Sequence, residues 1–88
     1  MRRIKLTGRE VTIVRAIGFT DGASGAEIEE FTRMEPGDVV DTINSLMSAG
    51  FVESVPYYDQ IEMAAVAETI FEVNPSYIHE IKGACRRS

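Results

Sequence analysis

The chain has one cysteine, one histidine and no tryptophan among its 88 residues. A single cysteine, Cys85, can form no internal disulfide, and no Cys-x-x-Cys pair is present to hold zinc. A single histidine, His79, excludes a histidine-rich metal site. On a helix His79 lies about 120° from Cys85, so the two cannot act together as a nucleophile and its base. We therefore expect a cytoplasmic protein that is not an enzyme and that uses no metal or cofactor.

Long apolar segments are also missing. No stretch approaches the roughly 18 apolar residues that a membrane-spanning helix requires, and Arg9 and Glu10 interrupt the apolar run that would follow the basic start of a signal peptide. Hydrophobic residues make up 44% of the chain and charged residues 26%, which is typical of globular proteins. We expect residues 1–88 to form one soluble domain without a membrane partner, whose core is too small for a deep catalytic cleft.

Positive charge is absent from the middle of the chain. Residues 34–81 contain no Lys or Arg but nine Asp and Glu, whereas the net charge of the whole chain is −5. The cations lie towards the two ends of the chain, and they are Arg2, Arg3, Lys5, Arg9, Arg15, Arg33, Lys82, Arg86 and Arg87. A surface built from residues 34–81 is therefore expected to repel polyanions and to attract basic partners.

Two capping boxes indicate where helices begin. Thr7 with Glu10, and likewise Ser24 with Glu27, place a hydroxyl at the cap and a glutamate three residues later. They predict one helix over residues 8–17, ended by Gly18, and a second, short helix that begins at residue 25.

The remaining elements follow from apolar spacing and from proline. A third helix is expected to begin with Pro36, because its missing amide hydrogen suits a first turn. Strands are predicted over residues 51–55 and 69–73 as an antiparallel pair, and a last helix over residues 75–85. Residues 60–68 are compatible with helix or strand, and their alanine-rich composition favours helix. The apolar stripe of the third helix spans about 120° and consists of Val39, Val40, Ile43, Leu46 and Met47.

This order of elements resembles the winged helix-turn-helix superfamily. In regulators of the MarR and ArsR kinds, the third helix commonly ends in a leucine, two further residues and Ala-Gly-aliphatic before the wing. The matching residues here are Leu46, Ala49, Gly50 and Phe51, and the resemblance covers roughly residues 7–73. It implies a mainly α fold with a three-helix core, a small antiparallel β-wing of two or three strands, and an extra C-terminal helix.

In DNA-reading members of this superfamily, the outer face of the third helix enters the major groove. The corresponding face of helix 34–49 carries two carboxylates and no cation, and its residues are Asp38, Asp41, Thr42, Asn44, Ser45 and Ser48. Affinity for a duplex depends largely on neutralised phosphates. We therefore expect this acidic helix and the wing to bind a protein partner or a second copy of the chain.

The alternative is a sequence-specific DNA-binding transcriptional regulator. In that case helix 34–49 would read the bases, while basic N- and C-terminal arms would contact the phosphates. The N-terminal arm would comprise residues 1–6, with Arg2, Arg3 and Lys5 as the contacting side chains.

The C-terminal helix, expected over residues 75–85, carries an apolar stripe formed by Tyr77, Ile78 and Ile81. Regulators of this superfamily commonly build dimer contacts on an element added after the wing, so the resemblance implies a homodimer through this stripe. The other reading is that the stripe folds back onto the domain's own core.

Overall fold

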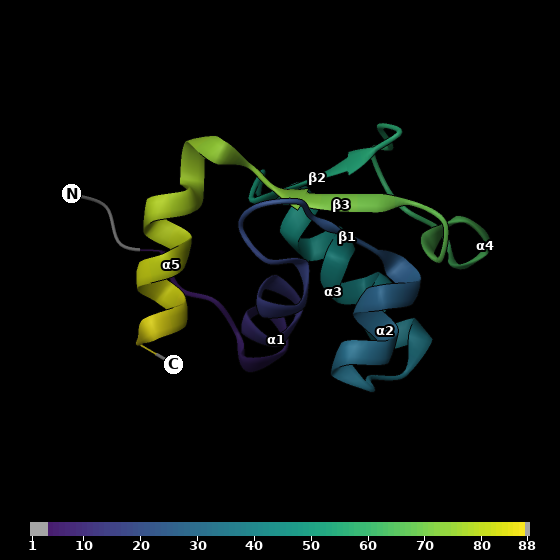
Figure 1. The fold of residues 1–88 in the computed structure, drawn as a ribbon, viewed down its shortest axis with the longest axis horizontal. Coiled ribbons are helices and arrows are strands. Elements are labelled where there is room, and N and C mark those ends of the chain that lie inside the picture. Colours follow the sequence, from purple (N-terminus) through teal and green to yellow (C-terminus); the bar gives the residue numbers. More distant parts are fainter. Residues whose placement is uncertain (1–3, 88) are drawn as a thin grey trace.

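The computed structural model describes residues 4–87, in which five α-helices and one 3₁₀ turn accompany a three-stranded antiparallel sheet. In chain order these are α1 (Gly8–Ile17), β1 (Ala23–Ser24), α2 (Gly25–Thr32), α3 (Pro36–Ser48), β2 (Val52–Val55), α4 (Met63–Val66), β3 (Ile70–Val73), the 3₁₀ turn η1 (Pro75–Tyr77) and α5 (Ile78–Arg86). Figure 1 shows α1, α2 and α3 beneath the sheet, with α5 at one end of the long axis and α4 at the other. The prediction of a mainly helical domain with a small antiparallel sheet is confirmed.

Both predicted capping boxes are present. At the start of α1, Thr7 Oγ1 accepts from the Glu10 amide at 3.1 Å, and Glu10 Oε1 accepts from the Thr7 amide at 2.8 Å. Ser24 and Glu27 repeat this arrangement at the start of α2, with the same two distances. Each box satisfies two amides that the helix itself leaves without a partner, and this explains why both helices begin where the sequence predicted.

The sheet has the strand order β1-β3-β2, so β3 lies in the middle. The predicted pair of strands is confirmed as antiparallel, with Val52 opposite Val73 and Val55 opposite Ile70. Strand β1 was not predicted, because two residues carry no alternation that could reveal a strand. Its Ala23 pairs with Phe71, and this links the segment between α1 and α2 to the centre of the sheet.

Residues 60–68 are helical only in part. Of the two possibilities left open for this segment, the favoured helix forms only in its middle, as α4 over Met63–Val66. Ile61 precedes α4 and is 1% exposed, and Thr69 follows it and donates from Oγ1 to the Ala65 carbonyl at 2.7 Å. The segment is therefore shaped by one buried side chain on each side of a single helical turn.

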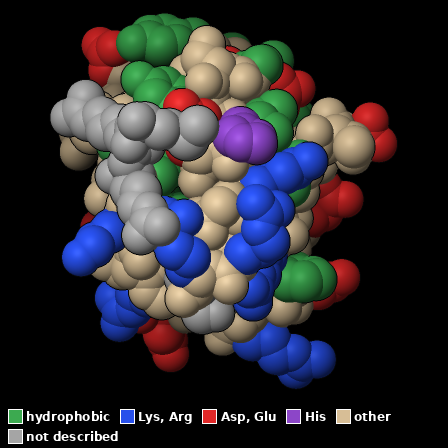
Figure 2. Space-filling view, turned by 90° about the vertical axis from the view of Figure 1, so that its left-hand side faces the viewer, with side chains coloured by type: hydrophobic (Ala, Val, Ile, Leu, Met, Phe, Trp, Pro, Cys, Tyr) green, Lys and Arg blue, Asp and Glu red, His purple; other side chains and the backbone are tan. Residues whose placement is uncertain are grey.

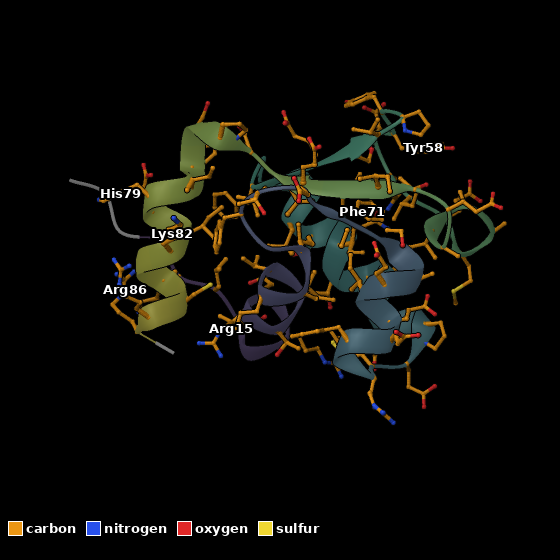
Figure 3. The ribbon with its side chains drawn as sticks, viewed as in Figure 1. Arg15, Tyr58, Phe71, His79, Lys82 and Arg86 are labelled. Carbon is orange, nitrogen blue, oxygen red and sulfur yellow. The ribbon has the colours of Figure 1, made fainter. Side chains whose placement is uncertain are left out.

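The core lies between the helices and the inner face of the sheet. Its fully buried large side chains are Phe71, Ile13, Ile28, Ile43, Leu46, Ile61 and Ile81. They come from all three helices under the sheet, from β3, from the segment before α4 and from α5. The labelled Phe71 in Figure 3 marks the point where the sheet meets these helices.

The helix α5 packs on the domain's own core. Ile81 is completely buried, and the ring of Tyr77 meets that of Phe51 edge to face at 5.2 Å between centroids. Ile78 is partly buried against the same cluster. Within this chain Ile81 covers the core, while Tyr77 and Ile78 stay partly exposed, and the homodimer through this stripe stays a prediction.

No helix in residues 4–87 combines the length and the apolar character that crossing a bilayer would require.

Candidate functional site

The outer face of α3 is narrower than the sequence predicted. Thr42 was assigned to this face but is 7% exposed, and Asn44 is half-buried. On a helical wheel each lies about 40° beyond a margin of the apolar stripe, so neighbouring elements that cover slightly more than the stripe also cover these two side chains. Thr42 therefore does not belong to the exposed face.

Both the nitrogen and the oxygen of the Asn44 carboxamide are hydrogen-bonded to the chain. Its Nδ2 donates to the Ile61 carbonyl at 3.0 Å, and its Oδ1 accepts from the Ile61 amide at 2.7 Å. Both polar groups of the carboxamide are thus used to hold the segment before α4 against α3. The sequence assigned Asn44 to contact with a ligand, whereas the structure places it in a structural hydrogen-bond pair.

Acids and their partners dominate what remains of the α3 face. Asp38 lies 3.5 Å from Nη1 of Arg9, and the Ser45 hydroxyl donates to Glu10 Oε2 at 3.1 Å. Asp41 and Ser48 are exposed. This face offers a partner chiefly carboxylates, because one of its hydroxyls is already bonded to α1.

A second candidate surface lies on the outward side of the β2–β3 pair. Val55 and Ile70 face each other across the strands and are 52% and 37% exposed. Beside them Glu53 lies directly opposite Glu72, and both are exposed. Two apolar side chains and two like charges therefore share one solvent-facing patch. The apolar pair is not covered by the rest of the domain, and the carboxylates form no salt bridge within the described residues.

The loop that follows β2 extends this patch. Tyr57 is 77% exposed, and its hydroxyl donates to Asp59 Oδ1, a hydrogen bond that, with the negative charge of Asp59, raises the pKa of Tyr57. The Tyr58 amide donates to Ser54 Oγ at 2.9 Å and fixes the loop against the strand. Between the loop and β2, an edge strand of the sheet, lies an open hollow of about 330 Å³.

We call this region the hairpin surface, and define it by Glu53, Val55, Tyr57, Asp59, Ile70 and Glu72. The lack of Lys and Arg in residues 34–81 predicted negative charge in this region, whereas its exposed apolar members were not predicted. The alternation of β2 and β3 was the available signal, because it places Val55 with Glu53 and Ile70 with Glu72 on one side of the sheet.

A third candidate surface gathers positive charge at the α5 end of the molecule. We call it the α5 face, and it consists of the exposed side chains Lys5, Arg15, Lys82, Arg86 and Arg87. Figure 2, which views the molecule from the α5 end, shows Lys and Arg side chains clustered below the single histidine. These residues come from the N-terminal segment, α1 and the C-terminal helix, so only folding brings them together.

Several contacts hold the α5 face in place. Arg15 Nη2 donates to the Cys85 carbonyl at 3.1 Å, and Arg87 Nη2 donates to the Ile4 carbonyl at 2.9 Å. The Lys82 ammonium lies 5.2 Å from the centre of the Phe19 ring. In Figure 3 Arg15 points from α1 towards the C-terminal part of α5, where Arg86 lies. Of the basic arm proposed from the sequence, Lys5 belongs to this face, while Arg2 and Arg3 lie outside the described residues.

The described residues contain no group of three or more His, Cys, Asp or Glu side chains arranged to hold a metal ion. The lone thiol, Cys85, is buried. Comparison of the chain with protein-family models, with curated proteins and with solved structures gives no match in any of the three.

Proposed function

We propose that the chain is a non-catalytic winged-helix module that binds a basic protein partner through the hairpin surface. The observation that carries this proposal is the exposed pair Val55 and Ile70, flanked by Glu53 and Glu72, within a region of sequence that contains no Lys or Arg. Apolar side chains surrounded by charge of one sign suit a protein that supplies both apolar contact and cations.

The order of elements supports the winged-helix part of the proposal. Strand β1 lies between α1 and α2 and pairs with β3, so the sheet has the three strands that the resemblance allows for the wing. The α3 helix leads directly into β2 through Ala49 and Gly50, with Gly50 at a positive φ of 83°. In this assignment β2, β3 and their connecting loop form the wing.

The facing carboxylates are a further argument for a basic partner. Like charges directly opposite each other on a sheet are destabilising. Glu53 and Glu72 occupy such positions, and nothing in the described part of the chain pairs with them by a salt bridge. A guanidinium or ammonium group of the partner placed between them would relieve this repulsion. The repulsion that destabilises the free domain would therefore add to the free energy of binding.

The geometry of α3 weighs against the DNA-reading alternative. A base-reading helix needs free polar side chains and cations close to the phosphates. Thr42 is buried, Asn44 is bonded to Ile61, and Ser45 is bonded to Glu10. Asp38 and Asp41 would have to approach phosphate groups of the same sign.

The proposal is tested by fluorescence anisotropy with a short labelled peptide of alternating arginine and valine. Binding is expected in the micromolar range, and a peptide with glutamate in place of arginine should not bind. A peptide of alternating arginine and glycine should bind at least about tenfold more weakly, because it lacks the apolar contact with Val55 and Ile70.

Matched variants assign the contact to the hairpin surface. Ile70→Ser should weaken binding at least about fivefold, whereas Phe31→Ser removes an apolar side chain that is 67% exposed on α2 and should leave it unchanged. The proposal is wrong if both variants bind as the wild-type chain does, or if the arginine–glycine peptide binds equally well.

A further inference from the structure

We propose that the α5 face binds the phosphate backbone of double-stranded nucleic acid, independently of the hairpin surface. This site lies on α5 and α1, away from the face of α3 that the fold-level resemblance would assign to DNA. The juxtaposition of Lys5, Arg15, Lys82, Arg86 and Arg87 on one side of the molecule is the observation that carries it.

The cations of α5 form a continuous stripe. Lys82 and Arg86 are four residues apart and so lie one helical turn from each other, about 6 Å along the axis. His79, one turn before Lys82, lies about 20° from Arg86 around the helix. Glu80 is the one acid of this helix, and it lies about 120° from Arg86 and about 160° from Lys82.

Neighbouring segments widen the stripe into a face. Arg15 lies beside the end of α5 because its guanidinium is bonded to the Cys85 carbonyl, and Lys5 lines the same shallow hollow as Arg87. Arg15 and Arg87 each use one of the five N–H donors of the guanidinium in a hydrogen bond to a backbone carbonyl, so donors remain for a phosphate. The bonds also reduce the side-chain freedom that binding would otherwise have to remove.

The chemistry of the α5 face favours nucleic acid over a membrane or a protein. The large apolar side chains that are exposed within residues 4–87 are Phe31, Val55, Tyr57, Tyr58, Met63 and Ile70, all of them in other parts of the domain. A helix that inserts into a bilayer surface needs exposed apolar residues, and the core of a protein interface is also apolar. A partner recognised by cations alone is one that displays regularly spaced anions, as the phosphate backbone does.

The distribution of acids sets the orientation of binding. The helix α4 and the loop after β2 lie away from α5, as Figure 1 shows, so a duplex on the α5 face would be remote from the acids at that end of the molecule, such as Asp59, Glu62 and Glu68. Binding is therefore expected to be weak, independent of sequence and strongly dependent on salt, because it rests on phosphate contacts without base contacts.

The test is fluorescence anisotropy of the full chain with a short random-sequence DNA duplex at several salt concentrations. With about four phosphates neutralised, log K should fall with log salt at a slope of about −3 to −4. Arg86→Glu should weaken binding at least about fivefold and reduce the slope by about one. The matched control is Arg33→Glu, which makes the same charge change at the end of α2 and should alter affinity less than about twofold.

Other results would overturn the proposal. It is wrong if the duplex does not bind at low salt, or if Arg33→Glu weakens binding as much as Arg86→Glu does, since binding would then follow net charge alone. It is also wrong if a Lys82→Glu/Arg86→Glu chain, shown by circular dichroism to be folded, binds normally while replacement of Arg2 and Arg3 abolishes binding. Salt-dependent self-association in sedimentation without duplex binding would assign the α5 face to the acidic end of a second copy instead. None of these results depends on whether the hairpin surface binds a basic peptide.

Discussion

The Asn44 side chain forms two hydrogen bonds with the backbone of a single residue, Ile61, one through its amide nitrogen and one through its oxygen. The two residues are 17 positions apart, and the pair fixes the loop after β2 against the middle of α3. It also holds the completely enclosed Ile61 side chain in the core. Asn44 is therefore a structural link between the helix and the hairpin surface.

Asn44→Ala should lower the free energy of unfolding by about 1–3 kcal/mol, because both backbone groups of Ile61 lose their partner in a partly buried setting. Asn44→Asp keeps the acceptor and loses the donor, so its cost should also be substantial. Urea denaturation monitored by circular dichroism measures both. Ser48→Ala, on the exposed side of the same helix, is the control and should change stability by less than about 0.5 kcal/mol. An Asn44→Ala chain as stable as this control would show that the pair contributes nothing.

Gly25 should tolerate no side chain. A Cβ at this position would lie 1.9 Å from the Val66 carbonyl oxygen, so the backbone of α2 and that of α4 would have to separate. Gly25→Ala should therefore cost about 3 kcal/mol or more, or prevent folding. Gly8→Ala is the matched control, since nothing lies within 4 Å of the added methyl group, and it should raise stability by about 0.4–1 kcal/mol. A lower melting temperature for Gly25→Ala and a higher one for Gly8→Ala would confirm the close approach of the two backbones. An unchanged melting temperature for Gly25→Ala would contradict it.

Reversing one charge of the facing pair should stabilise the domain. Glu72→Lys converts the repulsion with Glu53 into an attraction, and the expected gain in the free energy of unfolding is about 0.2–1 kcal/mol at low salt. The gain should shrink as salt is added. Glu68→Lys makes the same charge change outside the strands and serves as the control. If both substitutions give the same gain, the effect comes from net charge and the cross-strand pair is irrelevant. If the hairpin surface binds as proposed, Glu72→Lys should also weaken binding of the arginine–valine peptide.

The thiol of Cys85 should be unreactive in the folded chain. Burial raises its pKa, and the Arg15 guanidinium nearby offsets only part of that rise. Because the native pKa is raised, the protonated thiol favours the folded state, and this contribution is lost as the pH rises above the unfolded pKa of about 8.5. Reaction with a thiol-specific disulfide reagent at pH 8 should be at least about a hundredfold slower than in urea-unfolded chain. Equal rates in the two states would show that the thiol is accessible.

The pH dependence of stability gives a second measurement. Above about pH 8.5 the wild-type chain should lose stability faster than Cys85→Ala, because only the wild-type thiol ionises on unfolding. The comparison of the two chains removes the contribution of tyrosines and lysines that titrate in the same range. Parallel pH profiles would contradict the raised pKa.

Local signals in the sequence were sufficient to locate most of the elements. The boxes Thr7–Glu10 and Ser24–Glu27 predicted the starts of α1 and α2 because their hydrogen bonds are made within one turn. Pro36 predicted the start of α3 because a first turn needs no partner for its missing amide hydrogen. The two-residue β1 could not be found in this way, since it is a strand only because β3 lies beside it.

The candidate sites were harder to predict, because they depend on contacts between distant segments. A helical wheel places Thr42 and Asn44 outside the apolar stripe, but it contains no information about Ile61, which approaches Asn44 from the loop after β2. The apolar stripe of α5 fitted either a dimer contact or the core, and only the position of α5 beside α1 shows that Ile81 belongs to the core. The α5 face was likewise visible in the sequence only as separate basic ends.

The cluster of cations at one end of the 38 Å axis has a practical consequence for purification. A protein of pI about 4.8 is normally expected to pass through a cation-exchange resin at neutral pH. This one presents five of its cations together at the α5 end, so it should be retained by such a resin at low ionic strength, oriented with α4 outward. The same preparation should also be retained by an anion exchanger in the reverse orientation, and its bulk charge would be a poor guide to either behaviour.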